Sequence, residues 1–187
     1  MNDDEYTAYC AYIASLKERP ERKPHRLPIE NYATSDCEFF FTICADDRQA
    51  QPFTNATLAQ SILDSLVHIR KQYGWTLYCY CLMPDHLHFI ARLPEREIEH
   101  FDAGARGVVP KTILDHIGAF KSFTTSQIWW KQGHSGVLWQ KSSYDSAIRY
   151  NDSIRPAVLY VLNNPVRAGL VAHWEDYPYS RVVDAVL

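Results

Sequence analysis

A chain of 187 residues, 47% of them hydrophobic, is long enough to bury a core, and its length favours one domain. Its formal net charge of -3 gives no whole-protein signature of nucleic-acid binding. The first residues, MNDDEYTAYC, lack the basic and apolar regions of a signal peptide, and no run approaches the ~18 apolar residues of a membrane span. We therefore expect a cytoplasmic protein with no membrane association.

The first predicted elements are a helix and a linker. Apolar residues recur at helical spacing over Glu5–Leu16, and the KERPERKPHRLP that follows is too rich in proline and charge for a buried element. We predict an N-terminal helix and basic linker over residues 1–30 and one folded domain over residues 31–187.

A strand, a helix and two more strands come next. Cys37–Ala45 is β-prone, and Thr57 can cap a helix whose apolar residues recur every three or four positions until Gly74. WTLYCYCLM and HLHFIARL then follow, separated only by Pro84 and Asp85. This pattern predicts two antiparallel strands joined by a tight turn.

The last predicted elements are a helix over Lys111–Trp130, a strand over Tyr144–Ile148, and a helix that Asp152 or Ser153 caps and that runs through Asn163. The complete order is β-α-β-β-α-β-α. This order is typical of an α+β fold with a ferredoxin-like, split βαβ antiparallel sheet and helices packed on it.

Charge is distributed unevenly along the chain. Between Gly104 and Leu170 there are eight basic and three acidic residues, a local net of +5. Such a surface either attracts an anionic partner or is a solvated face that lacks carboxylates, and charge alone leaves both interpretations open.

Five cysteines without a C-x-x-C pair favour reduced thiols in a reducing compartment. Cys79 and Cys81 are expected to share one strand face. Two small buried residues is the favoured interpretation, and a contribution to a zinc site is the alternative.

The stretch LMPDHLHFIAR places two histidines in an otherwise apolar strand. Because successive strand residues point to opposite faces, His86 and His88 share one face, while Leu87 and Phe89 point to the other. Two imidazoles at this spacing can converge on one cation. The spacing also arises by chance on a solvent-exposed face, so the pair alone is a weak motif.

The stretch RPAVLYVLNNPVRAGLV adds two further candidates. On the predicted last helix, Tyr160 and Asn164 are four residues apart and lie on one face. A nucleophilic hydroxyl would then lie beside a third ligand oxygen. Alternatively, Tyr160 is a core aromatic residue and Asn163-Asn164-Pro165 only ends the helix.

Five blocks together resemble one family. They occur in order from about Arg26 to Ser180: FFFTICADDRQAQPF, YCLMPDHLHFIARLP, AFKSFTT, LWQKSSYDSAIR and YVLNNPVRAGLV...WEDYPYS. This combination resembles the REP-associated tyrosine transposases, which are transposases of the His-hydrophobic-His single-strand endonuclease superfamily.

The resemblance implies a metal-dependent transposase that cleaves and rejoins single-stranded DNA at hairpins through a 5′-phosphotyrosine. It implies that Tyr160 is the nucleophile, and that His86, His88 and Asn164 hold Mg²⁺ or Mn²⁺. A cation on a phosphate oxygen neutralises developing charge, which a phenol of pKa near 10 needs in order to attack. The partner would be single-stranded or hairpin DNA, and the oligomeric state stays open between a homodimer and a monomer.

Several residues compete for these roles or add to them. Tyr144 and Tyr150 are alternative nucleophiles, but only Tyr160 has a polar ligand candidate one helical turn later. Trp139 or the Trp129-Trp130 pair could stack on unpaired bases. Four basic residues are the candidates for contact with DNA phosphates: Lys121, Arg149, Arg155 and Arg167.

Two rival functions remain. A histidine-triad nucleotide hydrolase would need a third alternating histidine, and that position is Ile90. A binding module is harder to separate by sequence, because the same sheet fold hosts nucleic-acid binders and the site residues can persist after cleavage activity has lapsed.

Overall fold

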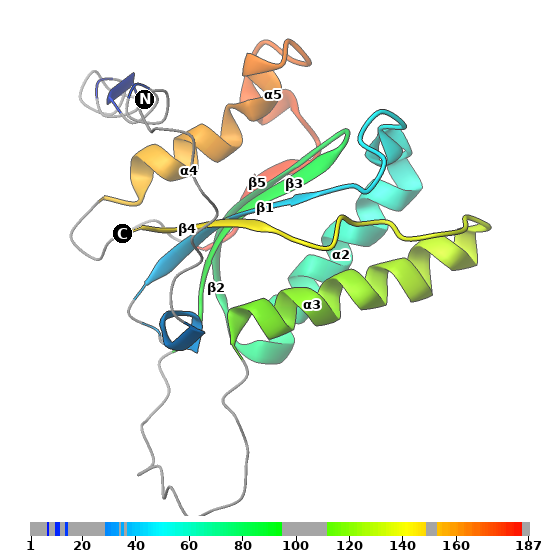
Figure 1. Ribbon diagram of the computed structural model, residues 1–187. Coiled ribbons are helices and arrows are strands. Elements are labelled where there is room, and N and C mark those ends of the chain that lie inside the picture. Colours follow the sequence, from blue (N-terminus) through cyan, green and yellow to red (C-terminus); the bar gives the residue numbers. More distant parts are fainter. Residues whose placement is uncertain are drawn as a thin grey trace, which may run out of the picture.

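The structure is a computed structural model, and it describes residues 7, 10, 11, 14, 29–33, 35, 37–94, 112–148 and 153–184. A five-stranded sheet forms its centre (Figure 1). The strands are β1 (Glu38–Cys44), β2 (Thr76–Met83), β3 (His86–Arg92), β4 (Tyr144–Ile148) and β5 (Ser180–Val182).

The strand order is β4-β1-β3-β2-β5, and every neighbouring pair is antiparallel. The first four strands in this order, 4-1-3-2, form the predicted ferredoxin-like sheet, so the α+β prediction is confirmed. The tight turn between β2 and β3 is also confirmed.

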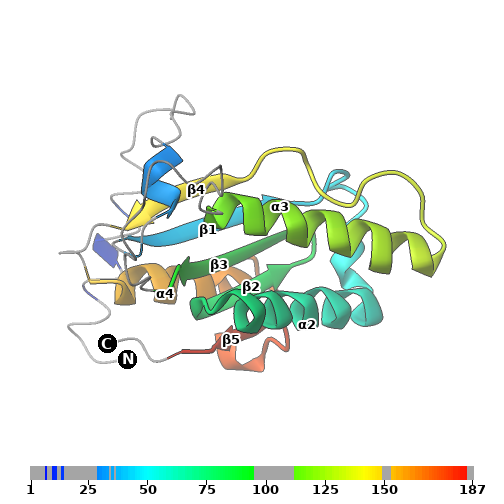
Figure 2. The ribbon, with the colours of Figure 1, turned by 90° about the horizontal axis from the view of Figure 1, so that it is seen from below.

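Helices cover both faces of the sheet. One face carries α2 (Ala56–Tyr73) and α3 (Ile113–Phe123), and the other carries α4 (Arg155–Leu162), as Figures 1 and 2 show from two directions. The short α5 (Asn164–Arg167) follows α4. Shorter helical turns complete the described fold: Ile29–Ala33, Pro52–Thr54, Thr124–Trp129, Trp130–Gln132 and Trp174–Asp176.

Two apolar clusters correspond to the two faces. The larger cluster joins β1, β2 and β3 to α2 and α3, and it contains Leu87 and Phe89. The smaller one contains Cys79, Cys81 and Ile90 and packs against α4. The alternation predicted for β3 is therefore confirmed, and the central strands are buried on both sides.

The predicted cap of α2 is wrong by two residues. Asn55, not Thr57, is the N-cap, and its side chain accepts from the Leu58 N–H at 3.0 Å. Asn55 has an extended backbone, which a cap needs, whereas Thr57 already lies inside the helix. The predicted end is correct, because Gly74 takes a left-handed φ of 70° as the C-cap.

Helix α3 also differs from its prediction in its last part. The α-helical hydrogen bonds stop at Phe123, and the chain continues as a single π-helical segment, Thr124–Trp129. Thr124 is fully buried, and its hydroxyl donates to the Phe120 carbonyl at 2.8 Å. This side-chain bond to the helix backbone competes with the regular pattern where the α-helix ends.

Three sequence-based predictions fall outside the described residues, wholly or mostly. They are the helix over Glu5–Leu16, of which only four residues are described, the basic linker, and the roles of Arg149 and Tyr150. The predicted division of the chain at residue 30 likewise stays a prediction.

Candidate active site

The two histidines lie on the α4 face of the sheet. His86 is the first residue of β3, directly after the turn, and His88 pairs with Thr42 of β1 and Cys81 of β2. Thr42 in turn pairs with Tyr144 of β4. Because paired residues project to the same side, these side chains form a row on one face.

Each imidazole is held by one oxygen atom. His86 Nδ1 donates to Asp85 Oδ1 at 2.6 Å, and His88 Nδ1 lies 2.8 Å from Thr42 Oγ1. The other carboxylate oxygen of Asp85 accepts from Arg48 Nε at 2.6 Å. A continuous polar chain therefore runs from Arg48 through Asp85 to the His86 ring.

Burial keeps both imidazoles neutral. His88 is only 7% exposed, and burial, with His86 nearby, lowers its pKa to about 3. Burial also lowers the pKa of His86, although Asp85 opposes that shift. Burial alone would raise the pKa of Asp85, but hydrogen bonds from His86 and Arg48 outweigh it and the pKa is lowered. A charged Asp85 thus faces a neutral ring with its Nε2 lone pair available.

The facing ring atoms suit a cation. His86 Nε2 and His88 Nε2 lie 3.0 Å apart. Two imidazole nitrogens at this separation could both serve one bound ion as ligands. The Thr42 hydroxyl can donate or accept, so it fits either tautomer of His88. These are the oriented, neutral imidazoles that metal ligation requires.

Tyr160 lies over this row of side chains. Its ring is centred 6.4 Å from the His88 ring and 5.9 Å from Phe40, in edge-on arrangements. The guanidinium of Arg167 lies 4.5 Å from the centre of the Tyr160 ring, a cation–π contact. Helix α4 thus brings the predicted nucleophile to the face that carries the histidines.

Asn164 follows Tyr160 by one helical turn, as expected. Its Nδ2 donates to the carbonyls of Tyr160 at 2.8 Å and Val161 at 3.2 Å. The amide nitrogen therefore serves the helix, which leaves Oδ1 as the atom that could act as a ligand. These contacts tie Asn164 to its own helix, and its role as a ligand stays a prediction.

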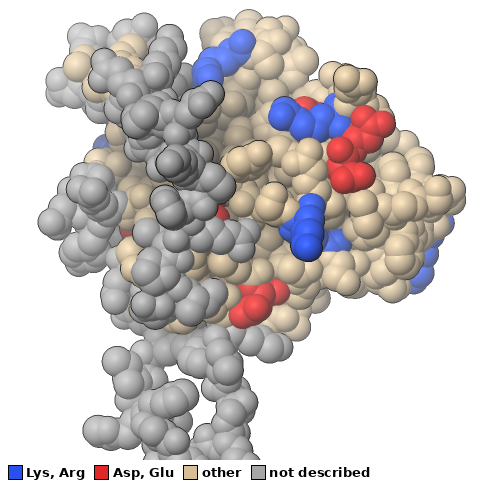
Figure 3. Space-filling model, in the orientation of Figure 1, with Lys and Arg blue, Asp and Glu red and all other residues tan. Residues whose placement is uncertain are grey.

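The predicted DNA-contacting residues do not lie together. Arg155 begins α4 and Arg167 touches Tyr160, and both are exposed. Lys121 lies on α3, across the sheet from the histidines, where its ammonium donates to three backbone carbonyls: those of Gln140, Lys141 and Ser142. These bonds stabilise the loop before β4, and a contact of Lys121 with DNA remains untested. Figure 3 shows basic side chains scattered among acidic ones on the face in view.

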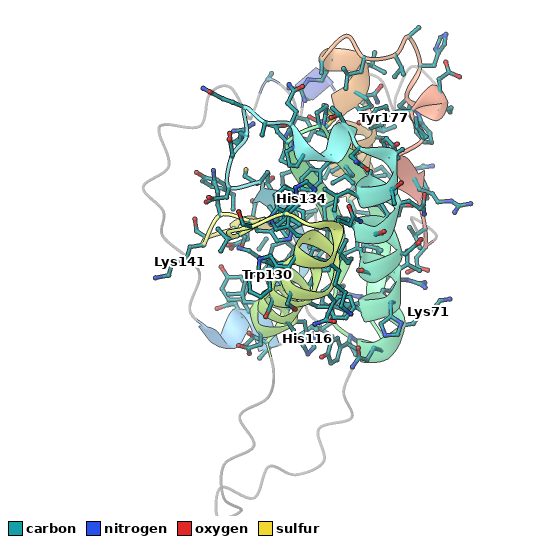
Figure 4. All side chains as sticks on the ribbon, turned by 90° about the vertical axis from the view of Figure 1, so that its right-hand side faces the viewer. Lys71, His116, Trp130, His134, Lys141 and Tyr177 are labelled. Atoms are coloured by element: carbon teal, nitrogen blue, oxygen red, sulfur yellow. The ribbon has the colours of Figure 1, made fainter. Side chains whose placement is uncertain are left out.

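The predicted stacking role of Trp139 is wrong. Its ring is buried against Phe53 and Phe120, and its Nε1 donates to Thr124 Oγ1 at 2.7 Å. An indole held in the core has no face open to a base. Trp130 is exposed, and Figure 4 shows it on the side of α2 and α3.

The zinc alternative for the cysteines fails. Cys79 and Cys81 share one face, as predicted, but both are fully buried. Burial raises the pKa of the Cys81 thiol to about 12, and it raises that of Cys79 further. No group of three His, Cys, Asp or Glu side chains in the described part of the chain is arranged to hold a metal.

A surface groove of about 530 Å³ lies elsewhere on the molecule. It is lined by residues of α2 and α3, including His68 and Phe123. It therefore opens on the face opposite the histidines, so it is no part of the candidate site. A DNA strand that lies across an open surface needs no enclosed pocket.

Comparison with known families decides the relationship. The model of the family described as "Transposase IS200 like" matches residues 33–163, most of the chain. The chain belongs to the IS200-like transposase family. The matched range contains both histidines, Tyr160 and the whole of the 4-1-3-2 sheet.

Two relatives of this IS200-like transposase refine the picture. The REP-associated tyrosine transposase of Escherichia coli (strain K12) is 25% identical over 142 residues, which cover 76% of this chain and 74% of the relative. A solved structure of a REP-associated tyrosine transposase bound to a REP hairpin is 22% identical. It aligns with a TM-score of 0.63 over 85% of this chain and 82% of its own. The similarity to REP-associated tyrosine transposases expected from the sequence is confirmed.

The structure also bears on membrane association. Among the helices that are described, none is both long and apolar enough to cross a membrane. The predicted location in the cytoplasm stays a prediction.

Proposed function

We propose that this IS200-like transposase cleaves and rejoins single-stranded DNA, with Tyr160 as the nucleophile. The observation that carries the proposal is the position of the Tyr160 ring. Its centre lies 6.4 Å from the centre of the His88 ring, on the face where the Nε2 atoms of His86 and His88 converge. Membership of the transposase family supports DNA as the substrate.

The proposed reaction is a transesterification. The Tyr160 oxygen attacks a phosphodiester phosphorus, its proton passes to solvent, and the bond from phosphorus to the 3′ oxygen breaks. That 3′ oxygen takes up a proton, and the 5′ phosphate remains on the tyrosine. A later 3′-hydroxyl attacks the phosphotyrosine, which restores the phenol and a phosphodiester bond without an outside energy source.

His86, His88 and the Oδ1 atom of Asn164 are the proposed ligands of Mg²⁺ or Mn²⁺. When bound, such an ion supplies charge neutralisation at a phosphate oxygen. Asp85 and Thr42 hold the two rings in the orientation that ligation needs. A set of two nitrogens and one oxygen leaves positions for water and phosphate.

The proposed substrate is a DNA hairpin from a repeated palindromic element. Its support is the relative solved in complex with a REP hairpin, which has the same fold. A hairpin provides a paired stem beside an unpaired flank, and the strand to be cut lies in that flank.

A denaturing gel with end-labelled hairpin oligonucleotides from the genome's own repeats tests the proposal. With Mn²⁺ or Mg²⁺, the wild type and Tyr144→Phe should form a covalent protein–DNA adduct, and Tyr160→Phe should form none. An adduct that persists in Tyr160→Phe would overturn the assignment of the nucleophile. Tight hairpin binding with no adduct from any variant would instead show a binding protein that has lost cleavage.

A further inference from the structure

The loop between β1 and the Pro52–Thr54 turn is fixed to the turn before His86. The Ala45 N–H donates to the Asp85 carbonyl at 2.9 Å, and the Phe53 N–H donates to the Pro84 carbonyl at 3.0 Å. Within the loop, Asp47 Oδ1 accepts two backbone N–H groups, those of Gln49 and Ala50. The backbone that carries Arg48 is therefore held on both sides.

Arg48 uses only one edge of its guanidinium in this arrangement. Its Nε donates to Asp85 Oδ2, while the side chain as a whole is 52% exposed. A guanidinium has five N–H donors in a rigid plane. When its Nε–H donates to Asp85, the pair of N–H groups at the far end of the plane, one on each terminal nitrogen, is directed away from that bond. Within the described residues, the Arg48 side chain forms its ion pair with Asp85.

We propose that the terminal nitrogens of Arg48 bind a backbone phosphate of the DNA strand beside the one that is cleaved. This inference rests on the proposed function. A guanidinium fixed on one edge is preorganised to bind phosphate with two parallel hydrogen bonds. One carboxylate and one imidazole separate Arg48 from the converging Nε2 atoms, so it contacts a neighbouring phosphate and not the reacting one.

The surroundings of Arg48 fit a strand that passes across this edge of the site. Tyr144 is 66% exposed, and it lies on the histidine face, where it pairs with Thr42 of β1. An exposed aromatic ring on the same face as a fixed cation is an arrangement on which a single strand can stack a base and bind a phosphate. Arg48 therefore links the backbone of the substrate to the residue that orients His86.

Arg48→Gln tests the proposal, with Lys71→Gln as the control for loss of one charge. Lys71 is exposed on α2, away from the site (Figure 4). Affinity for the labelled hairpin oligonucleotide is measured in EDTA, so that no metal contributes. Arg48→Gln should bind about ten-fold more weakly. Its log–log dependence on salt should be shallower by about 0.7. Lys71→Gln should stay within about two-fold of the wild type.

Two further measurements separate the alternatives. The first is the Mn²⁺ affinity of Arg48→Gln and the wild type without DNA, which reports on the support that Arg48 gives to Asp85. The second is hairpin binding by Arg48→Lys, which keeps the charge but lacks the planar donors. Arg48→Lys should keep the salt dependence of the wild type and lose part of its affinity for the hairpin. This variant also tests the proposal if Arg48→Gln does not fold. Hairpin binding in EDTA that is equal in wild type and both variants would overturn the phosphate contact, whatever happens to Mn²⁺. A wild type that binds no hairpin would overturn the proposed function itself.

Discussion

The residues that orient the histidines come from parts of the chain far from them. Thr42 lies 46 positions before His88, and Arg48 lies 37 positions before Asp85. The sequence identifies His86, His88 and Tyr160 through spacing and family resemblance, since a strand and a helix have fixed periods. It does not identify Thr42 or Arg48, because only the β1–β3 register and the fold of a loop bring them to the site.

Asp85 orients His86 but is not itself a proposed metal ligand. A change at Asp85 therefore tests how much the orientation of His86 contributes to metal affinity. Asp85→Asn removes the charge that holds the Nδ1–H of His86 and pairs with Arg48. Mn²⁺ affinity, measured by calorimetry, should fall by about 10-fold to 100-fold, as is usual for an outer partner of a metal-bound histidine.

Asp64→Asn is the matched control for Asp85→Asn. Asp64 is exposed on α2, where it accepts from Gln60 Nε2 at 2.8 Å. Its Mn²⁺ affinity should equal that of the wild type. If Asp85→Asn bound Mn²⁺ as tightly as Asp64→Asn, with both proteins folded, Asp85 would have no part in orienting the site.

At the scale of elements, the sequence predicts long periodic segments better than their ends. The bounds of β4 agree with the prediction residue for residue, and β2 and β3 agree closely, because alternation and a tight turn define them. Strand β5 was not predicted, since three residues, two of them exposed, carry no recognisable pattern. The π-helical turn also has no sequence period of its own, because it depends on the buried Thr124.

The position of the α2 cap gives a stability prediction. Asn55→Ala removes the acceptor of the Leu58 N–H and should lower the free energy of unfolding by about 1 kcal/mol. Thr57→Ala, at the cap expected from sequence, should change it by less than about 0.5 kcal/mol, because Thr57 is exposed inside the helix. Urea unfolding measures both, and a larger effect from Thr57→Ala would contradict the cap assignment.

At the scale of the whole molecule, the sheet separates most of the core from the candidate site. The face under α2 and α3 holds most of the core, whereas the face under α4 carries the histidines and Tyr160. The candidate site therefore lies in the layer that α4 covers in the described part of the chain. The choice between a homodimer and a monomer stays a prediction, since one chain is described.

The α4 layer also predicts how stability changes at alkaline pH. Burial raises the pKa of Cys79, of Tyr177 and of Cys81, the last from 9.0 to about 12. The unfolded chain ionises the two thiols above about pH 9 and the phenol above about pH 10, while the folded chain keeps them protonated, so stability falls as pH rises toward 12.

Urea unfolding at pH 7.5 and pH 10 measures this loss. The free energy of unfolding should be lower at pH 10, and the difference should be smaller in Cys81→Ala. A difference that Cys81→Ala leaves unchanged would show that the Cys81 thiol does not contribute.

Tyr160 is the residue proposed to form the covalent bond to DNA. The most direct measurement is mass spectrometry of the protein–DNA adduct after nuclease and protease digestion, which locates the residue that carries the nucleotide. We expect the nucleotide on the peptide that contains Tyr160, with its 5′ phosphate joined to the phenolic oxygen. A nucleotide on Tyr144 or Tyr150 would contradict it.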